Sequence, residues 1–218
     1  MSLRPDLDAI PLYAPSVLAD VTLDLRDNIN LWGAPASALA ALRTAAPSLL
    51  TEYPRVSAHA LTSALSAALG VSPQQIVAGC GSDDVIDACL RAVSTAGGRV
   101  AHADPTFSMV PTFARLNRLE PVAVPLRADG AMDVDGLIAT GATLIYVCSP
   151  NNPTGTVTPR ADLLRLFDNA PGIVLLDEAY GEFTEAHDLR QEAARRENVL
   201  VTRTFSKAWG LAGLRVGY

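Results

Sequence analysis

The sequence predicts an α/β fold, a three-layer sandwich in which helices cover both faces of a mostly parallel sheet. Between residues 76 and 204, short apolar or β-branched runs alternate with longer stretches of helical period, which is typical of βαβ units. The composition is 49% hydrophobic and 18% charged, so the chain has enough apolar side chains for a packed core. An N-terminal arm and a helical stretch are expected to precede the sheet.

Six runs have the length and the continuous apolar character of buried strands. They cover residues 75–78, 99–103, 120–125, 143–147, 173–177 and 199–204. The apolar runs are all far too short to cross a bilayer as a helix. The sequence therefore predicts a buried sheet and no membrane partner.

Helices are expected in most of the gaps between these strands. Ser82 is a candidate cap for a helix through residue 92, with Asp83 and Asp84 in its first turn, where negative charge suits the helix dipole. Thr158 is a candidate cap for a helix over 160–169, which has a proline in its first turn.

The N-terminal stretch differs from the rest of the chain. Alanine-rich segments at 36–46 and 57–69 predict two helices ahead of the first strand. The first 30 residues are rich in proline and aspartate and have neither a helical nor a strand period. They are predicted to form an arm that packs on another part of the protein.

Charge and cysteine content argue against several classes of function. The 23 acidic and 17 basic residues give a net charge of -6 with no block of lysine or arginine, which disfavours nucleic-acid binding. The three cysteines have no CxxC spacing and the three histidines no ligand spacing, so we expect neither a disulfide framework nor a metal site. The N-terminus shows no apolar run of a signal peptide, which predicts a cytoplasmic protein.

Four groups of polar residues follow predicted strands, where open α/β sheets place their ligand sites. The first is Gly79-Cys80-Gly81-Ser82, a turn whose backbone N–H groups suit a phosphate. It lacks the GxGxxG spacing of a dinucleotide site and the lysine of a P-loop, so an ordinary turn is the alternative. The second, residues 148–155, is rich in asparagine and proline, and either presents an amide to a ligand or is only a turn.

The other two groups carry charge. Asp177 ends an apolar strand, and Tyr180 follows three residues later. A buried carboxylate is costly unless it is paired, so Asp177 either makes a salt bridge or a helix cap, or keeps a heterocyclic nitrogen protonated. Lys207 lies among apolar neighbours in the glycine-rich segment 202–215. Such surroundings lower an amine pKa, as imine formation requires, whereas the alternative is a solvated surface lysine.

Four motifs occur in a fixed order: Ser-Pro-Asn-Asn-Pro-Thr-Gly at 149–155, Asp-Glu-Ala-Tyr at 177–180, Ser-Lys-Ala at 206–208 and Gly-Leu-Arg-Val-Gly at 213–217. In these motifs the sequence resembles the fold-type I aminotransferases that depend on pyridoxal 5'-phosphate (PLP), most of all the histidinol-phosphate aminotransferases. The resemblance implies a PLP-binding large domain over 51–218, incomplete at its C-terminus, after an arm and part of a small domain over 1–50. The family's C-terminal small domain is expected to be missing from a truncated chain.

The resemblance also implies roles for the residues of the motifs. Lys207 would carry the cofactor as a Schiff base and then move a proton between the substrate and the cofactor. Asp177 would pair with the pyridine nitrogen, and Asn152 and Tyr180 would hydrogen-bond the 3'-oxygen. Phe107 would stack on the ring, at a position where the family usually has tyrosine.

A phosphate site and a dimer follow from the same resemblance. The phosphate would sit at the start of a helix, at Ser82 and Asp83, and would be bound by the side chains of Thr204, Ser206 and Arg215. Tyr53 would reach the phosphate of a neighbouring subunit, which implies a homodimer with shared active sites.

Substrate contacts are implied for the segment near residue 30. Asn28 and Asn30 would line the substrate site, where Ile29 and Leu31 replace the family's glutamate and proline. The implied reaction moves an amino group from a donor, with L-histidinol phosphate as the first choice, to 2-oxoglutarate. Decarboxylation and carbon–sulfur lysis use the same cofactor residues and are alternatives, as is a PLP-binding module without catalytic activity.

Overall fold

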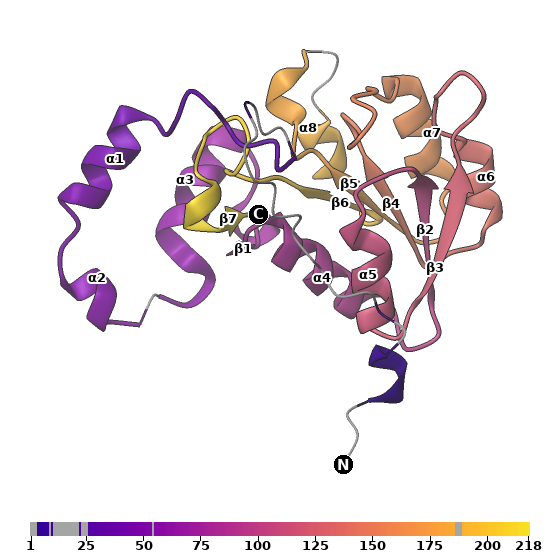
Figure 1. The fold of residues 1–218 in the computed structure, drawn as a ribbon, viewed down its shortest axis with the longest axis horizontal. Helices are drawn as coiled ribbons and strands as arrows, with labels where there is room; N and C mark the ends of the chain where they lie inside the picture. The colour runs from indigo at the N-terminus through magenta and orange to yellow at the C-terminus, as the bar shows by residue number, and fades with distance from the viewer. Residues whose placement is uncertain (1–3, 9, 11–21, 23–25, 54, 186–188) are drawn as a thin grey trace.

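The computed structural model describes residues 4–8, 10, 22, 26–53, 55–185 and 189–218. Five parallel strands form the central sheet in the order β3-β2-β4-β5-β6 (Figure 1). Their bounds are β2 Arg99–Asp104, β3 Glu120–Pro125, β4 Leu144–Cys148, β5 Ile173–Asp177 and β6 Val199–Thr202. The sheet confirms five of the six predicted strands and the predicted α/β class.

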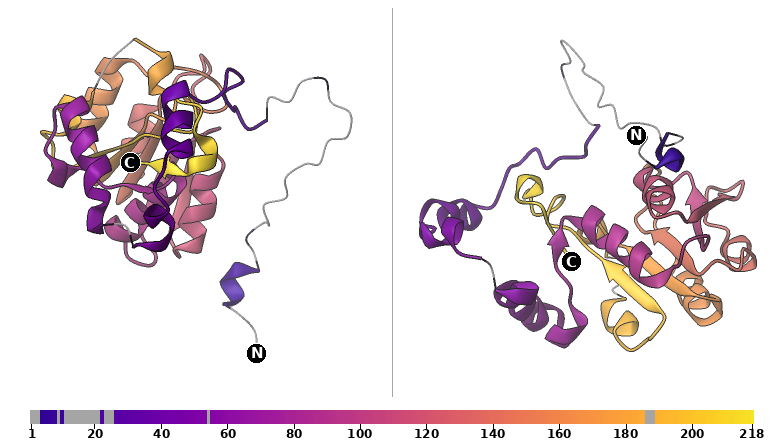
Figure 2. Two further views of the ribbon diagram at one scale, coloured as in Figure 1. Left: turned by 90° about the vertical axis from the view of Figure 1, so that its left-hand side faces the viewer. Right: turned by 90° about the horizontal axis from the view of Figure 1, so that it is seen from below.

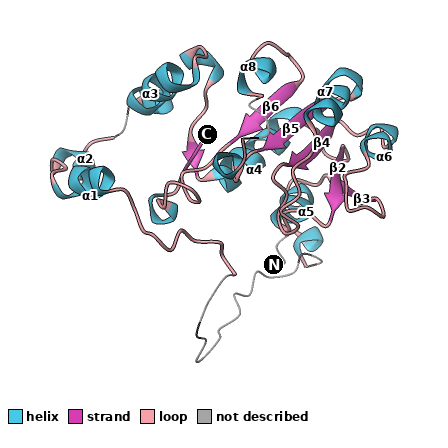
Figure 3. Ribbon diagram, turned by 90° about the horizontal axis from the view of Figure 1, so that it is seen from above, coloured by secondary structure: helices cyan, strands magenta, loops and turns pink. Residues whose placement is uncertain are grey.

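Helices cover both faces of this sheet. One face carries α4 (Ser82–Val93) and α5 (Met109–Leu116), and the other carries α6 (Val134–Ala139), α7 (Arg160–Asn169) and α8 (Arg190–Ala193) (Figure 3). Because side chains alternate along a strand, each face has its own apolar core. In β5, Leu176 belongs to the core with Phe167 of α7, and Leu175 to the core with Ile86 of α4. The predicted three-layer sandwich is confirmed.

A short two-stranded sheet lies beside the start of α4. β1 (Gly79–Cys80) pairs antiparallel with β7 (Val216–Gly217), and Gly217 also bridges to Thr204, beyond the end of β6. The backbones approach closely here, since a Cβ atom on Gly217 would lie 2.4 Å from the Ser82 nitrogen. This pairing holds β7 and the loop before it against the N-terminus of α4.

In the described part of the chain, the α-helices α1, α2 and α3 precede the sheet. α1 (Ala36–Arg43) and α2 (Ser48–Thr51) contain no buried residue and lie apart from the sheet (Figures 1 and 2). α3 (His59–Leu69) buries Thr62 and Leu65. Much of the predicted arm over residues 1–30 lies outside the described residues.

The predicted strand at 75–78 is wrong. Pro73–Gln75 forms a 3-10 turn, and Ile76 has extended backbone angles, φ -116° and ψ 127°. The segment pairs with no strand among the described residues. An apolar, extended run becomes a strand only when a neighbour supplies the ladder of backbone hydrogen bonds.

The two predicted helix caps are also wrong. Gly81, with φ 83°, is the N-cap of α4 and Ser82 is its first helical residue. Its positive φ favours glycine over residues with a side chain, and the Arg215 guanidinium lies close by, with Nη2 2.4 Å from where a Cβ atom on Gly81 would be. At α7 the N-cap is Pro159, whereas Thr158 is buried and its N–H donates to Ser149 Oγ at 3.0 Å.

The two predicted alanine-rich helices exist but are shorter. α1 ends at Arg43, where Thr44 Oγ1 donates to the Ala40 carbonyl at 3.0 Å. Ser57 and Ala58 have φ values of 64° and 46°, so α3 begins only at His59.

Candidate active site

Charged groups from distant parts of the sequence share one region beside the start of α4 and the end of β5. The charges of four groups act on the Lys207 amine, namely Asp27, Asp83, Asp177 and Arg215. The carboxyl ends of parallel strands form the usual ligand edge of an open α/β sheet. Three of these charges lie in or next to three of the four polar groups that the sequence singles out.

Lys207 is the only lysine of the 218 residues, so the other 16 of the 17 basic residues are arginines. The side chain is half-buried, and its Nζ atom donates to the Asp27 carbonyl oxygen at 2.7 Å and lies 5.7 Å from the centre of the Tyr180 ring. Burial lowers the pKa of the Lys207 amine, although the negative charge of Asp27 acts in the opposite direction. A guanidinium stays protonated at working pH, which leaves Lys207 as the one side-chain amine able to act as a nucleophile.

An N-terminal segment crosses the loop that carries Lys207. Asn28 Nδ2 donates to the Tyr180 hydroxyl at 3.0 Å, and Asn30 Nδ2 donates to the Ala208 carbonyl at 2.9 Å. At Gly210, a Cβ atom would lie 2.4 Å from the Gly33 carbonyl oxygen, so the two segments touch. Both predicted substrate residues are thereby placed beside the lysine.

Asp177 is a buried carboxylate with two hydrogen-bond donors. Its side chain is 3% exposed, and it accepts from the Tyr146 hydroxyl at 2.6 Å and from the Ala179 N–H at 2.9 Å. Among the described residues no cation forms an ion pair with it. Burial raises its pKa to about 6, although the hydrogen bond from Tyr146 acts in the opposite direction.

This raised pKa predicts a pH-dependent stability for the protein without cofactor. The folded state holds the Asp177 proton up to about pH 6, while the unfolded chain releases it near 3.8, so the contribution of this group is lost as the pH rises through that window. Two pKa units correspond to about 3 kcal/mol. The free energy of unfolding of Asp177→Asn, relative to that of the parent protein, should therefore rise by about 3 kcal/mol as the pH goes from 4 to 7.

Urea unfolding of the two cofactor-free proteins at both pH values measures this difference. Asp129→Asn, a surface carboxylate that is 65% exposed, is the matched control and should show no such gain. An equal difference between parent and Asp177→Asn at both pH values would contradict the prediction.

The start of α4 and the loop before β7 form a cluster of donors. Arg215 lies against Gly81, and its Nη2 atom is 3.5 Å from an Asp83 carboxylate oxygen. Thr204 Oγ1 donates to Ser206 Oγ at 2.9 Å, and both side chains are buried. Free N–H groups at a helix start, together with hydroxyls and a guanidinium, suit an anion.

Asn152 and Phe107 lie near the same strand ends. Cys148, which opens the asparagine turn, is the register partner of Asp177. Within the turn it is Asn151 that is used structurally, since its side chain bonds to Thr106 and to the Pro105 carbonyl. The Asn152 side chain has no hydrogen-bond partner in the described part of the chain, and Phe107 is half-buried against the α4–α5 core.

Tyr53 is the one predicted site residue that a single chain does not bring to this region. It follows α2 and its side chain is fully exposed, at 101%. No hydrogen bond or ring contact joins it to another described residue.

Tyr146 is a site residue that the sequence reasoning missed. It lies within the apolar run of β4, where the pattern indicates only a core position. A phenol in a buried strand needs a polar partner, and the neighbouring strand ends in Asp177. That combination was the available signal.

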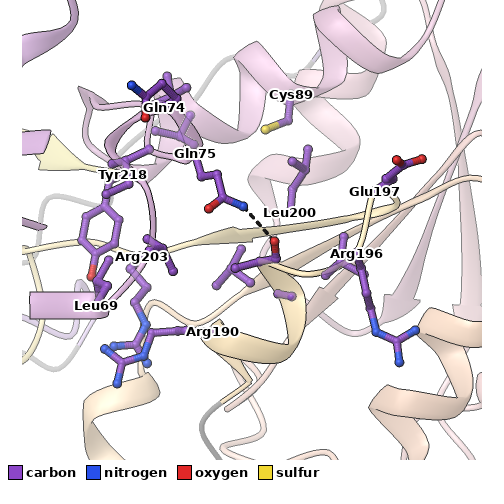
Figure 4. A pocket seen from close by; sticks show the side chains of 18 residues that line it. Leu69, Gln74, Gln75, Cys89, Arg190, Arg196, Glu197, Leu200, Arg203 and Tyr218 are labelled. Carbon is purple, nitrogen blue, oxygen red and sulfur yellow. Dashed lines mark hydrogen bonds between the residues drawn. The ribbon is translucent and has the colours of Figure 1, made fainter. Parts of the chain in front are cut away.

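A cavity of about 430 Å³ lies away from this site, between the 3-10 turn η3 (Pro73–Gln75), α8 and the free edge of β6 (Figure 4). Gln75 reaches across it and donates to the Ala194 carbonyl at 2.7 Å. None of the predicted site residues lines the cavity. Among the described residues no cluster of histidine, cysteine and acidic side chains suits a metal, and no helix is long and apolar enough to span a membrane.

Comparison with known proteins identifies the family of the chain. A profile for aminotransferases of class I and II matches residues 21–218. The chain belongs to this family. PLP is the cofactor that membership implies, and the expected resemblance is confirmed.

Similar proteins include aminotransferases of two named kinds. An aromatic amino acid aminotransferase of Rhodococcus jostii strain RHA1 is 41% identical over 221 residues, and a histidinol-phosphate aminotransferase of Roseiflexus castenholzii is 39% identical over 236 residues. Each alignment covers 99% of this chain and 62% of the relative. A structure of histidinol-phosphate aminotransferase from Sinorhizobium meliloti in complex with pyridoxal-5'-phosphate is 32% identical with a TM-score of 0.82, over 87% of this chain and 53% of that one. The chain thus spans less than two thirds of the length of these relatives.

Proposed function

We propose that this chain is the cofactor-binding part of a PLP-dependent aminotransferase in which Lys207 carries the cofactor. One observation supports this most strongly. The chain's only lysine lies, with a lowered pKa, in the same charged region as a buried carboxylate that no described cation pairs. An amine nucleophile and an unpaired anion are what PLP requires at its aldehyde and its ring nitrogen.

The residues around Asp177 fit the ring of PLP. A protonated pyridine nitrogen would give the Asp177 carboxylate the cation that it lacks, and so offset the cost of its burial. Asn152 and Tyr180 would donate to the 3'-oxygen, and Phe107 would stack on the ring. The free side chain of Asn152 is consistent with this role.

The cluster at the start of α4 fits the phosphate. The backbone N–H groups of Ser82 and Asp83 would donate to it, with Thr204, Ser206 and Arg215 as side-chain donors. The Asp83 carboxylate would repel a phosphate. Arg215 would therefore have a second role in this proposal, because its ion pair with Asp83 turns that carboxylate toward the guanidinium.

When bound, PLP supplies an electron-withdrawing ring that makes the α-proton of an amino donor acidic. Lys207 would hold the cofactor covalently, and its amine, once free, would take the proton from the donor's α-carbon. Burial of Lys207 favours the neutral amine that this step needs. Asn28 and Asn30 would bind the donor from the segment that crosses the lysine.

We propose L-histidinol phosphate as donor and 2-oxoglutarate as acceptor, and the names of the relatives support either this donor or an aromatic amino acid. The test uses the full-length protein with PLP, 2-oxoglutarate and each donor in turn, and measures glutamate. Glutamate that requires both substrates supports transamination, and the better donor decides its class. Release of carbon dioxide or of a thiol without glutamate would contradict transamination and support the decarboxylase or lyase alternative. Binding of PLP without any turnover would support the non-catalytic module.

We also propose a homodimer with shared active sites. Leu49, Leu50 and Tyr53 are 71%, 91% and 101% exposed, so α2 presents apolar side chains that nothing in the described part of one chain covers. A second copy would cover them and place Tyr53 at its neighbour's phosphate. This arrangement accounts for the position of Tyr53 outside the site of its own chain.

Replacing Leu49 and Leu50 together by aspartate should convert the dimer to a monomer in sedimentation experiments, because two charges would enter an apolar interface. Leu116→Asp, on the exposed face of α5, is the matched control and should remain dimeric. Tyr53→Phe should remain dimeric and bind PLP about tenfold more weakly, for loss of one hydrogen bond to a charged group. A fully active monomer would contradict the shared site.

A further inference from the structure

Tyr146 is a buried polar side chain to which the proposed function gives no role. It lies in the middle of β4 and is 1% exposed. Its neighbours on this face of the sheet form the apolar core with α4 and α5, including Ile86, Leu90 and Val110. A hydroxyl in such surroundings costs stability unless it has a partner.

The partner of this hydroxyl is Asp177. The phenol oxygen lies 2.6 Å from Asp177 Oδ2, within the range of a strong bond to a charged acceptor. The thiol of Cys148, two residues along the same face of β4, also interacts with the phenol. Burial holds the pKa of Tyr146 well above its ordinary value, so the phenol keeps its proton and remains a donor.

Each oxygen of the Asp177 carboxylate accepts one hydrogen bond. Ala179 N–H donates to Oδ1 and Tyr146 donates to Oδ2, so the plane of the carboxyl group is fixed by contacts from β4 and from the turn after β5. A donor on Oδ2 favours the ionised form of Asp177. Asp83 and Glu178 act on the same group in the opposite sense, since their negative charges raise its pKa.

We propose that Tyr146 is a positioning residue that holds the Asp177 carboxylate ionised and oriented toward the cofactor's ring nitrogen. This inference rests on the proposed function, because that function assigns the ring nitrogen as the donor to this carboxylate. Without the phenol, Asp177 becomes the stronger base, and the proton that it shares with a ring nitrogen moves toward the carboxyl group. The ring nitrogen then carries less positive charge.

Tyr146→Phe removes only the hydroxyl and keeps the ring that fills the core. In the cofactor-free protein, carbon-13 NMR of labelled aspartate should show the Asp177 pKa raised in the variant. In the protein loaded with nitrogen-15-labelled PLP, the pyridine nitrogen signal should move toward that of the unprotonated ring. The value of kcat should fall about tenfold with little change in KM, as expected for one hydrogen bond to a charged group.

Tyr218→Phe is the matched control. Tyr218 is a half-buried tyrosine that lines the cavity of Figure 4 beside Arg203, and its replacement should leave the Asp177 pKa and the nitrogen signal unchanged. If Tyr146→Phe folds and shows the parent values for both signals, the inference is overturned. If the parent protein does not bind PLP, the proposed function fails instead, while the carbon-13 measurement still tests the bond between Tyr146 and Asp177.

Discussion

Lys207→Ala should abolish transamination by the PLP-loaded protein. The variant loses both the covalent attachment of the cofactor and the amine that moves the α-proton. General acid–base catalysis alone contributes roughly 10²–10⁴-fold, so we expect at least about a 10⁴-fold loss in kcat/KM. Assays that use a large amount of the variant and measure the glutamate formed after fixed times can detect a loss of this size.

Lys207→Arg is the matched control for charge. It keeps the positive charge beside Asp27 and Tyr180 but stays protonated, so it should be as inactive as Lys207→Ala and better folded. An arginine variant with substantial activity would mean that charge at this position is enough, and that Lys207 is not the nucleophile.

Asp177→Asn should have the second largest effect. The amide keeps the size of the side chain and removes the charge that would pair with the ring nitrogen. Removing one partner of a buried ion pair costs about 3–5 kcal/mol, which corresponds to a loss of roughly 10²- to nearly 10⁴-fold in kcat. The same change relieves the cofactor-free protein of a buried charge, so activity and stability should move in opposite directions.

The measurement for Asp177→Asn combines kcat with urea unfolding of the cofactor-free protein near pH 7. Asp177→Glu keeps the charge and should retain more activity than the amide. A variant that loses activity and stability together would indicate a structural role for Asp177, and this would contradict pairing with the cofactor.

The fold was predictable where the signal is local. Continuous apolar runs locate β4 and β5 most clearly, because these strands are buried on both faces and have no polar side. The edge strands β3 and β6 are less buried, but their short apolar runs also locate them. The segment 75–78 has the same apolar character, but its structure depends on a pairing partner that local sequence does not reveal. The cap at Gly81 was missed because it depends on a backbone conformation, φ 83°, that the residue types around it do not reveal.

Some residues of the candidate site were likewise predictable from the sequence, and others were not. Asp177 and Lys207 were singled out because the first ends an apolar strand and the second follows one, whereas Arg215 was predicted from the family resemblance of its motif. The structure brings the three charges together. Tyr146 was missed because a single tyrosine in an apolar strand resembles core, and only the register of β4 against β5 shows its partner. Tyr53 is fully exposed in one copy of the chain, so its role rests on the resemblance and on the proposed homodimer.

The most direct test of the account is reduction of the PLP-loaded protein with borohydride, followed by peptide mapping. We expect a visible absorption band that disappears on reduction, and a cofactor adduct on the peptide that contains Lys207, which is the only lysine within these 218 residues. A folded, dimeric protein that shows no band and yields no adduct on Lys207 would contradict the central claim.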